Sequence, residues 1–120
     1  MDDGSPKPRD LEERTFSFAQ EVRRFVKSLP RTLANAEDVR QLVRASGSVA
    51  ANWIEANEAL SKKDLLLRAK ICRKESKESR LFLRLLEINE ATRPGRDKLA
   101  REARELTLIF SAIVTKNDRP

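Results

Sequence analysis

The residues from Ser61 to Leu86 read SKKDLLLRAKICRKESKESRLFLRLL, and their spacing is that of an amphipathic α-helix. Apolar and small side chains recur there in alternating steps of four and three, at Leu65, Ala69, Cys72, Ser76, Ser79, Leu83 and Leu86. Residues at these steps share one side of an α-helix, so the stretch predicts a helix with a single inward stripe. Ser61 precedes the pattern as a capping residue, with Asp64 three positions later.

Three further segments of helical periodicity lie on either side of this one. They run from about Leu11 to Leu29, from the capping residue Asn35 to Asn57, and from about Asp97 to Lys116. Pro30 and the pair Pro94-Gly95 mark two of the breaks between segments. Because short connections favour antiparallel neighbours, we expect an all-α fold, an antiparallel up-down-up-down four-helix bundle.

A chain of 120 residues is long enough for one core, so we expect a single domain. The bundle is predicted over residues 11–117. Residues 1–10 are predicted to be a disordered N-terminal arm, because glycine, serine and two prolines interrupt any periodicity there. Residues 118–120 are predicted to be a disordered tail.

Small residues gather in the middle of the predicted second helix, in the run Ala45-Ser46-Gly47-Ser48. Such residues allow helix axes to approach to the lower end of their usual spacing of roughly 8–10 Å. Glycine inside a helix costs about 1 kcal/mol relative to alanine. We therefore expect that a methyl group at Gly47 would collide with a partner helix.

The chain has no histidine and a single cysteine, Cys72. This composition excludes Ser-His-Asp and Cys-His catalysis, histidine metal sites, thiolate zinc clusters and an intrachain disulfide. An enzyme would need an acid pair such as Glu55 and Glu58, which has no other catalytic partner in view. We therefore expect a non-enzymatic protein with no catalytic residue, no cofactor and no metal.

No segment predicts a membrane partner. The longest apolar runs, such as Leu65-Leu66-Leu67, are far shorter than the roughly 20 residues that span a bilayer. Three aspartates and two prolines occupy the first ten positions, where a signal peptide would carry basic and then apolar residues. We expect a cytoplasmic protein.

The net charge of the chain, +6, is the charge of one predicted helix, because nine basic and three acidic residues lie between Lys62 and Arg84. On a helical projection, basic residues form a stripe over about a third of the circumference. This basic stripe consists of Lys63, Lys70, Arg73, Lys74, Lys77, Arg80 and Arg84. Like charges four residues apart, as at Lys70 and Lys74, destabilise a helix by a few tenths of a kcal/mol each. We interpret the stripe as a nucleic-acid-binding surface that contacts phosphates without sequence preference.

A second apolar strip lies on the same predicted helix, outside the inward stripe. It consists of Leu67, Ile71, Phe82 and Leu85. One bundle has one core, so a second strip normally meets another chain. We predict that these residues form the interface of a homo-oligomer.

The segment from Arg44 to Ala56 reads RASGSVAANWIEA and resembles the Ser-Ile-x-x-Asn-aromatic-x-Glu-Ala segment of a bacterial family. The helix after Ser61 and the pair Leu29-Pro30 also resemble that family, over about residues 15–116. These are the four helix bundle proteins of bacteria, also described as proteins encoded in ribosomal-RNA intervening sequences. Val49 stands where the family pattern has isoleucine.

The resemblance implies a cytosolic up-down bundle that assembles as a barrel-shaped homopentamer around a central channel. For most members of the family no biochemical activity is known. One branch serves diversity-generating retroelements, where a basic pentamer associates with a reverse transcriptase and binds nucleic acid. Within the shared segment we interpret Trp53 as a core anchor. Asn52 and Glu55 are interpreted as structural residues that cap a loop or pair with an arginine.

The sequence leaves two functions open. The first is a non-enzymatic, pentameric protein that binds RNA or DNA through the basic stripe, as an accessory to a reverse transcriptase. The alternative is a protein-interaction scaffold whose basic stripe pairs with acidic surfaces of a partner or of the adjacent subunit.

Overall fold

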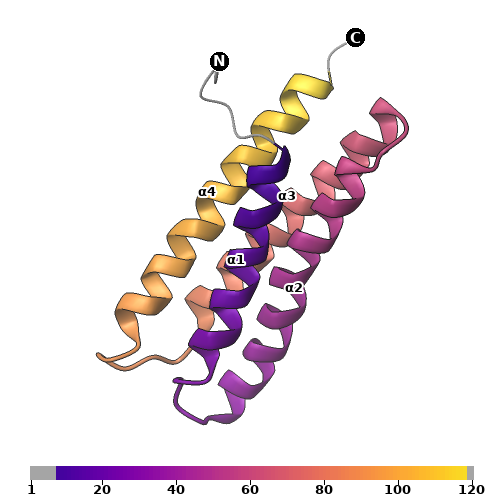
Figure 1. The fold of residues 1–120 in the computed structure, drawn as a ribbon. Helices are drawn as coiled ribbons and strands as arrows, with labels where there is room; N and C mark the ends of the chain where they lie inside the picture. The colour runs from indigo at the N-terminus through magenta and orange to yellow at the C-terminus, as the bar shows by residue number, and fades with distance from the viewer. Residues whose placement is uncertain (1–7, 119–120) are drawn as a thin grey trace.

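The structure is a computed structural model that describes residues 8–118. It contains helices α1 (Pro8–Val26), α2 (Leu33–Asn57), α3 (Lys62–Leu85) and α4 (Arg93–Asn117), and no strand within that range. Successive helices run in opposite directions, and the start of α1 lies at the same end of the molecule as the end of α4 (Figure 1). The predicted all-α, up-down-up-down bundle is confirmed.

Three helix starts differ from the predicted ones. α1 begins at Pro8, so residues 8–10 of the predicted arm are helical. α2 is capped by Thr32 and not by Asn35, because the Thr32 hydroxyl accepts the Asn35 backbone N–H at 3.1 Å. α4 begins at Arg93 with Pro94 in its first turn, where the missing N–H of proline has no helical partner to lose.

Residues 1–7 of the predicted arm and residues 119–120 of the predicted tail lie outside the described residues. Asp118, also predicted in the tail, is the C-cap of α4 and donates its backbone N–H to the Val114 carbonyl at 2.9 Å.

The four helices form a ring in chain order. Each helix packs against the ones before and after it, and α1 meets α4 to close the ring. The interface between α1 and α4 is the smallest of the four helix–helix interfaces. α3 packs extensively against both α2 and α4, and the close packing against α2 suits the small residues on their facing sides.

The predicted inward stripe of α3 is the core side of that helix. Ala69, Cys72, Ser76, Ser79, Leu83 and Leu86 are buried, and Leu65 is half-buried against the core. The other helices contribute larger side chains that are fully buried, among them Phe18, Leu42, Leu106 and Phe110. No helix within residues 8–118 is both long enough and apolar enough to cross a membrane.

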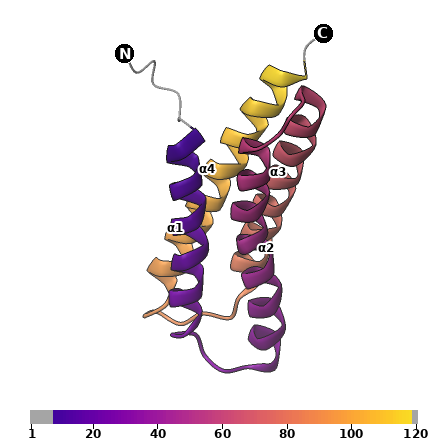
Figure 2. The ribbon, with the colours of Figure 1, turned by 45° about the vertical axis from the view of Figure 1, so that its right-hand side comes forward.

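The α1–α2 loop and the α3–α4 loop lie at the same end of the bundle (Figure 2). Asn35 joins these two loops through its side chain. Its amide Nδ2 donates to the carbonyls of Pro30 at 3.0 Å and Glu87 at 2.9 Å, and its Oδ1 accepts the Glu87 N–H at 2.8 Å. The side chain is buried, and its three bonds satisfy backbone groups of Pro30 and Glu87, which lie outside the helices. One amide thus fixes the α3–α4 loop to the start of α2.

Two glycines lie against neighbouring helices, with different atoms facing them. A methyl at Gly47 would meet a partner helix as predicted, but the nearest atom is Nη2 of Arg23 at 3.0 Å. That atom ends a flexible side chain, so the predicted collision can be relieved without moving a backbone. A methyl at Gly95 would lie 2.9 Å from Cδ1 of Phe25, a ring that packs against the core.

Candidate nucleic-acid interface

The basic stripe lies along α3 on sides that do not face the core. Its exposed members are Lys63, Lys70, Lys74, Lys77 and Arg84, and its half-buried members are Arg73 and Arg80. Within residues 8–118 only one of the seven forms an ion pair, which joins Nζ of Lys74 to Glu75 at 3.7 Å. The positive charge of the other six is therefore not neutralised inside the described bundle.

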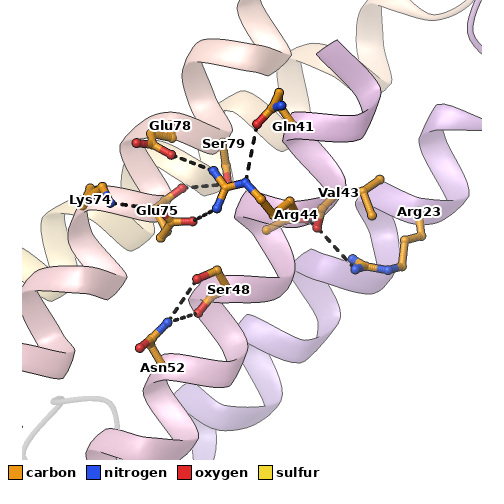
Figure 3. A network of polar contacts seen from close by, with 11 residues as sticks. Arg23, Gln41, Val43, Arg44, Ser48, Asn52, Lys74, Glu75, Glu78 and Ser79 are labelled. Atoms are coloured by element: carbon orange, nitrogen blue, oxygen red, sulfur yellow. Dashed lines mark hydrogen bonds and ion pairs between the residues drawn. The ribbon is translucent and has the colours of Figure 1, made fainter. Parts of the chain in front are cut away.

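Two acids of α3 lie on its other side, against α2. The guanidinium of Arg44 lies between them, with Nη1 3.1 Å from Glu75 and Nη2 3.0 Å from Glu78 (Figure 3). The Glu75 side chain is only 3% exposed. A buried carboxylate requires a charged partner, and Arg44 supplies it. The two acids are thus held by Arg44 at the α2–α3 seam, and of the basic stripe they offset only Lys74.

The acids of α4 are held in the same way at the α1–α4 seam. Arg14 of α1 makes a two-pronged contact with Glu102, through Nε and Nη2 at 2.8 Å each, and its Nη2 also lies 2.8 Å from Glu105. The hydrogen bond to Glu102 raises the pKa of Arg14 above its ordinary value, against the opposing effect of burial. These acids point away from α3.

Arginines of α4 extend the basic surface beyond the predicted stripe. A groove along the outer side of α3 and α4, here called the α3/α4 groove, is lined by Lys77, Arg80, Arg84, Arg96, Arg101 and Arg104, with Asp97 as its one acid. Its remaining lining residues are Leu81, Ala100, Thr107 and Leu108.

Sequence reasoning missed the three arginines of α4 because acidic and basic residues balance outside the segment from Lys62 to Arg84. The balance conceals a separation of charge, since α4 turns Glu102 toward α1 and Arg104 toward the α3/α4 groove. A helical projection of α4, like the one made for α3, could have identified these three arginines from the sequence.

A family model matches residues 9–111 of the chain, and its description is the 23S rRNA-intervening sequence protein. The chain belongs to this family. Within this member the segment that carried the resemblance, Arg44 to Ala56, lies on α2.

The fold of this intervening-sequence family member is shared by a solved structure. It is the 1.70 Å crystal structure of a protein of unknown function from the S23 ribosomal protein family of Bacteroides thetaiotaomicron VPI-5482. The TM-score is 0.73 at 22% sequence identity, and the match covers 90% of this chain and 97% of that one. The likeness supports the bundle fold alone. A search of curated proteins found no match.

Asn52 and Trp53 of the shared segment make structural contacts in this family member, whereas Glu55 is exposed. Nδ2 of Asn52 donates to the Ser48 carbonyl at 2.9 Å (Figure 3). Its Oδ1 accepts a hydrogen bond from Arg68 of α3 at 3.0 Å. Trp53 is buried, and its ring centroid lies 5.6 Å from that of Phe110. Both contacts agree with the interpretation of Asn52 as an arginine partner and of Trp53 as a core anchor.

The predicted oligomer strip divides into two parts. Leu67 and Leu85 each expose 53% of their surface, whereas Ile71 and Phe82 are half-buried and Phe82 packs against the monomer core. The side chains free to meet another chain are therefore chiefly the two leucines.

Cys72 lies in the core, where its thiol is not accessible to reagents in solution. Its thiol donates to the Val49 carbonyl at 3.5 Å, and burial raises its pKa to about 12. No group of three or more cysteine, aspartate and glutamate side chains within residues 8–118 is arranged to hold a metal ion.

Proposed function

We propose that this protein is a non-enzymatic, homo-oligomeric bundle of the cytoplasm that binds nucleic acid non-specifically through the basic stripe of α3. The observation that carries the proposal is the separation of charge across α3. Its acids Glu75 and Glu78 are held by Arg44, whereas six cations of the stripe make no ion pair within the described bundle.

The chemistry of the stripe suits phosphate contacts. Lysine and arginine bind phosphate oxygens, and each contact releases condensed counterions from the nucleic acid. None of the stripe residues is aromatic, so bases have no platform for stacking and sequence preference should be weak. The basic α3 is compatible with the retroelement branch of the family, in which a basic pentamer associates with a reverse transcriptase. This compatibility supports a pentamer with that accessory role.

A fluorescence-anisotropy titration with mixed-sequence RNA and DNA at two salt concentrations tests the proposal. If six or more phosphates are contacted, affinity should fall by about a thousand-fold or more between 50 and 200 mM salt. The triple variant Lys70→Glu, Lys74→Glu, Lys77→Glu should abolish binding and keep the helical circular dichroism spectrum.

The matched control is Lys27→Glu, Arg31→Glu, Lys116→Glu, which makes the same change in net charge at exposed positions off the basic stripe. This control should weaken binding only slightly. Equal losses in the two triple variants would mean that net charge, and not the stripe, drives binding. Absent or salt-independent binding by the unmodified protein would contradict the proposal.

A second candidate function is a protein-interaction scaffold, in which the basic stripe pairs with acids of a partner or of the adjacent subunit. One observation favours it: Leu81 and Leu108 are 47% and 55% exposed and line the α3/α4 groove beside arginines. Apolar side chains mixed with arginine are typical of protein interfaces. Under this alternative, reversing the stripe charges would break the oligomer, which multi-angle light scattering would detect.

A further inference from the structure

We propose that the principal nucleic-acid contact is the α3/α4 groove, and that it holds one phosphate backbone of a double-stranded nucleic acid. This inference rests on the proposed function and names its site and its substrate class. The sequence places the binding surface on α3 alone, whereas the structure brings the arginines of α4 beside it.

The groove has a cationic row on each side. Arg80 and Arg84 come from α3, and Arg101 and Arg104 come from α4. Lys77 extends the α3 row. None of these five forms an ion pair with another residue in the range 8–118. Five cations with no internal counterion therefore border one channel.

Arg96 and Asp97 lie at one end of the groove and form an ion pair with each other, so they add little net charge to it. Nε of Arg96 lies 2.8 Å from Asp97, and its Nη1 donates to the carbonyls of Leu83 at 3.4 Å and Arg84 at 3.5 Å. The Arg96 side chain is only 17% exposed. Because Arg96 binds the last carbonyls of α3, it ties α4 to α3 and holds the two rows at a set separation.

Guanidinium groups on both sides of the α3/α4 groove suit a phosphodiester backbone. The planar fork of arginine matches the oxygens of a phosphate, with two parallel hydrogen bonds from one side chain. Ala100 and Thr107 line the groove between the rows and are small, so a backbone can approach closely. A phosphate in the channel would be contacted from α3 and from α4 together.

The groove favours a duplex over a single strand. Proteins that hold single strands gain much of their affinity from the stacking of bases on aromatic side chains. The five phenylalanines and one tryptophan of the chain all fall outside the residues that line the groove. Without stacking, affinity follows phosphate charge density, which is highest in a duplex, with one charge per roughly 1.7 Å of axis.

Two charge-matched double variants test the groove against the distant part of the basic stripe. The groove variant is Arg101→Glu, Arg104→Glu on α4, and the comparison variant is Lys63→Glu, Lys70→Glu near the start of α3. Dissociation constants are measured by fluorescence anisotropy at 100 mM salt with 20-base-pair RNA and DNA duplexes and with 20-nucleotide single strands. Circular dichroism checks that each variant folds. If the two glutamates prevent folding, the variant Arg101→Gln, Arg104→Gln is used in place of the groove variant.

The groove variant should weaken duplex binding at least tenfold and lower the salt slope by about one for each phosphate that is no longer bound. The comparison variant should lose severalfold less, and the unmodified protein should bind duplexes at least fivefold more tightly than single strands. RNA and DNA duplexes that bind equally would show that the backbone charge alone is read, and a large difference would show that helix shape contributes. Either result keeps the duplex assignment.

Three outcomes overturn the inference. If the groove variant binds like the unmodified protein while the comparison variant loses binding, the site lies on α3 alone and the proposed function survives. If single strands bind as tightly as duplexes, the substrate class is wrong. If the unmodified protein binds neither form, the proposed function and this inference both fail.

Discussion

Asn35 shows how much a single buried amide can organise. Its two N–H groups and its carbonyl bind Pro30 and both backbone groups of Glu87. Its side chain therefore does not cap its own helix, and that role passes to Thr32. The residue type suits both tasks, since asparagine offers a donor and an acceptor on one short side chain.

Asn35→Ala should lower the free energy of unfolding by about 2–4 kcal/mol, because three part-buried hydrogen bonds of a buried side chain disappear. Urea denaturation followed by circular dichroism measures this. Asn57→Ala, at an exposed position on the same helix, is the control and should change stability by less than about 0.5 kcal/mol. Similar values for the two variants would mean that the loop clamp contributes nothing.

Cys72 is a core residue whose ionisation is suppressed by burial. An unfolded cysteine has a pKa of about 8.5, whereas in the folded protein the thiol pKa is about 12. Between these values the unfolded chain loses a proton that the folded chain keeps, so stability falls as pH rises.

The free energy of unfolding of the unmodified protein should therefore decrease more steeply than that of Cys72→Ser between about pH 9 and pH 12. The difference should approach 1.4 kcal/mol per pH unit, which is the value for one proton. Lysine titration is common to both proteins and cancels in the comparison. Parallel pH profiles would show that the thiol ionises as readily in the folded protein as in the unfolded chain.

At the scale of elements, the residues of α3 form four sides that differ in chemistry. One carries the small residues of the core, the second places Glu75 against Arg44, the third borders the α3/α4 groove, and the fourth exposes Leu67 and Leu85. Each neighbouring helix meets a different chemistry on the same helix. Because Arg44 holds Glu75 and Glu78, these acids offset only Lys74 of the basic stripe, and the remaining stripe cations keep their charge on one surface.

The two glycines at helix contacts should respond oppositely to a methyl group. Gly47→Ala should raise the free energy of unfolding by about 0.5–1 kcal/mol, because alanine favours the helix and the Arg23 side chain can move aside. Gly95→Ala should lower it by about 1–3 kcal/mol, because the ring of Phe25 is held by the core. Urea denaturation measures both changes. If Gly47→Ala is destabilised instead, the Arg23 side chain cannot move aside to make room for the methyl group.

At the scale of the whole molecule, the bundle leaves apolar side chains outside its single core. Leu67 and Leu85 share one side of α3, about 27 Å apart along the helix axis, which agrees with an extended contact and not a local one. Burial of a leucine contributes about 1.5–3 kcal/mol, so two of them can decide association. The predicted homo-oligomer should therefore depend on this side of α3.

Leu67→Lys, Leu85→Lys should weaken self-association by at least a hundredfold, because each interface loses two apolar anchors and gains two charges. Multi-angle light scattering across a dilution series measures the mass, and circular dichroism confirms folding. The control is Leu33→Lys, Leu60→Lys, which changes two leucines that are 86% and 100% exposed elsewhere. Dissociation of the control variant alone would place the interface on another face.

The sequence by itself determined the four helices, their alternating directions and the inward stripe of α3, because these follow from local periodicity and short connections. It also located the excess charge on one helix, since a helical projection needs no neighbour. The sequence placed the cap of α2 on Asn35, whereas Thr32 caps the helix. The sequence does not distinguish an asparagine that hydrogen-bonds to a distant loop, as Asn35 does, from one that caps its own helix.

Only the tertiary structure decided which charges meet. Arg14 and Arg44 lie far along the chain from the acids they hold, and Arg101 and Arg104 join the α3 cations only because α4 packs beside α3. Electrostatic interactions depend on distances in space, whereas a count along the chain sums charges without placing them. The six basic and three acidic residues of α4 are thus separated in space, with Glu102 and Glu105 held toward α1 and Arg101 and Arg104 lining the α3/α4 groove.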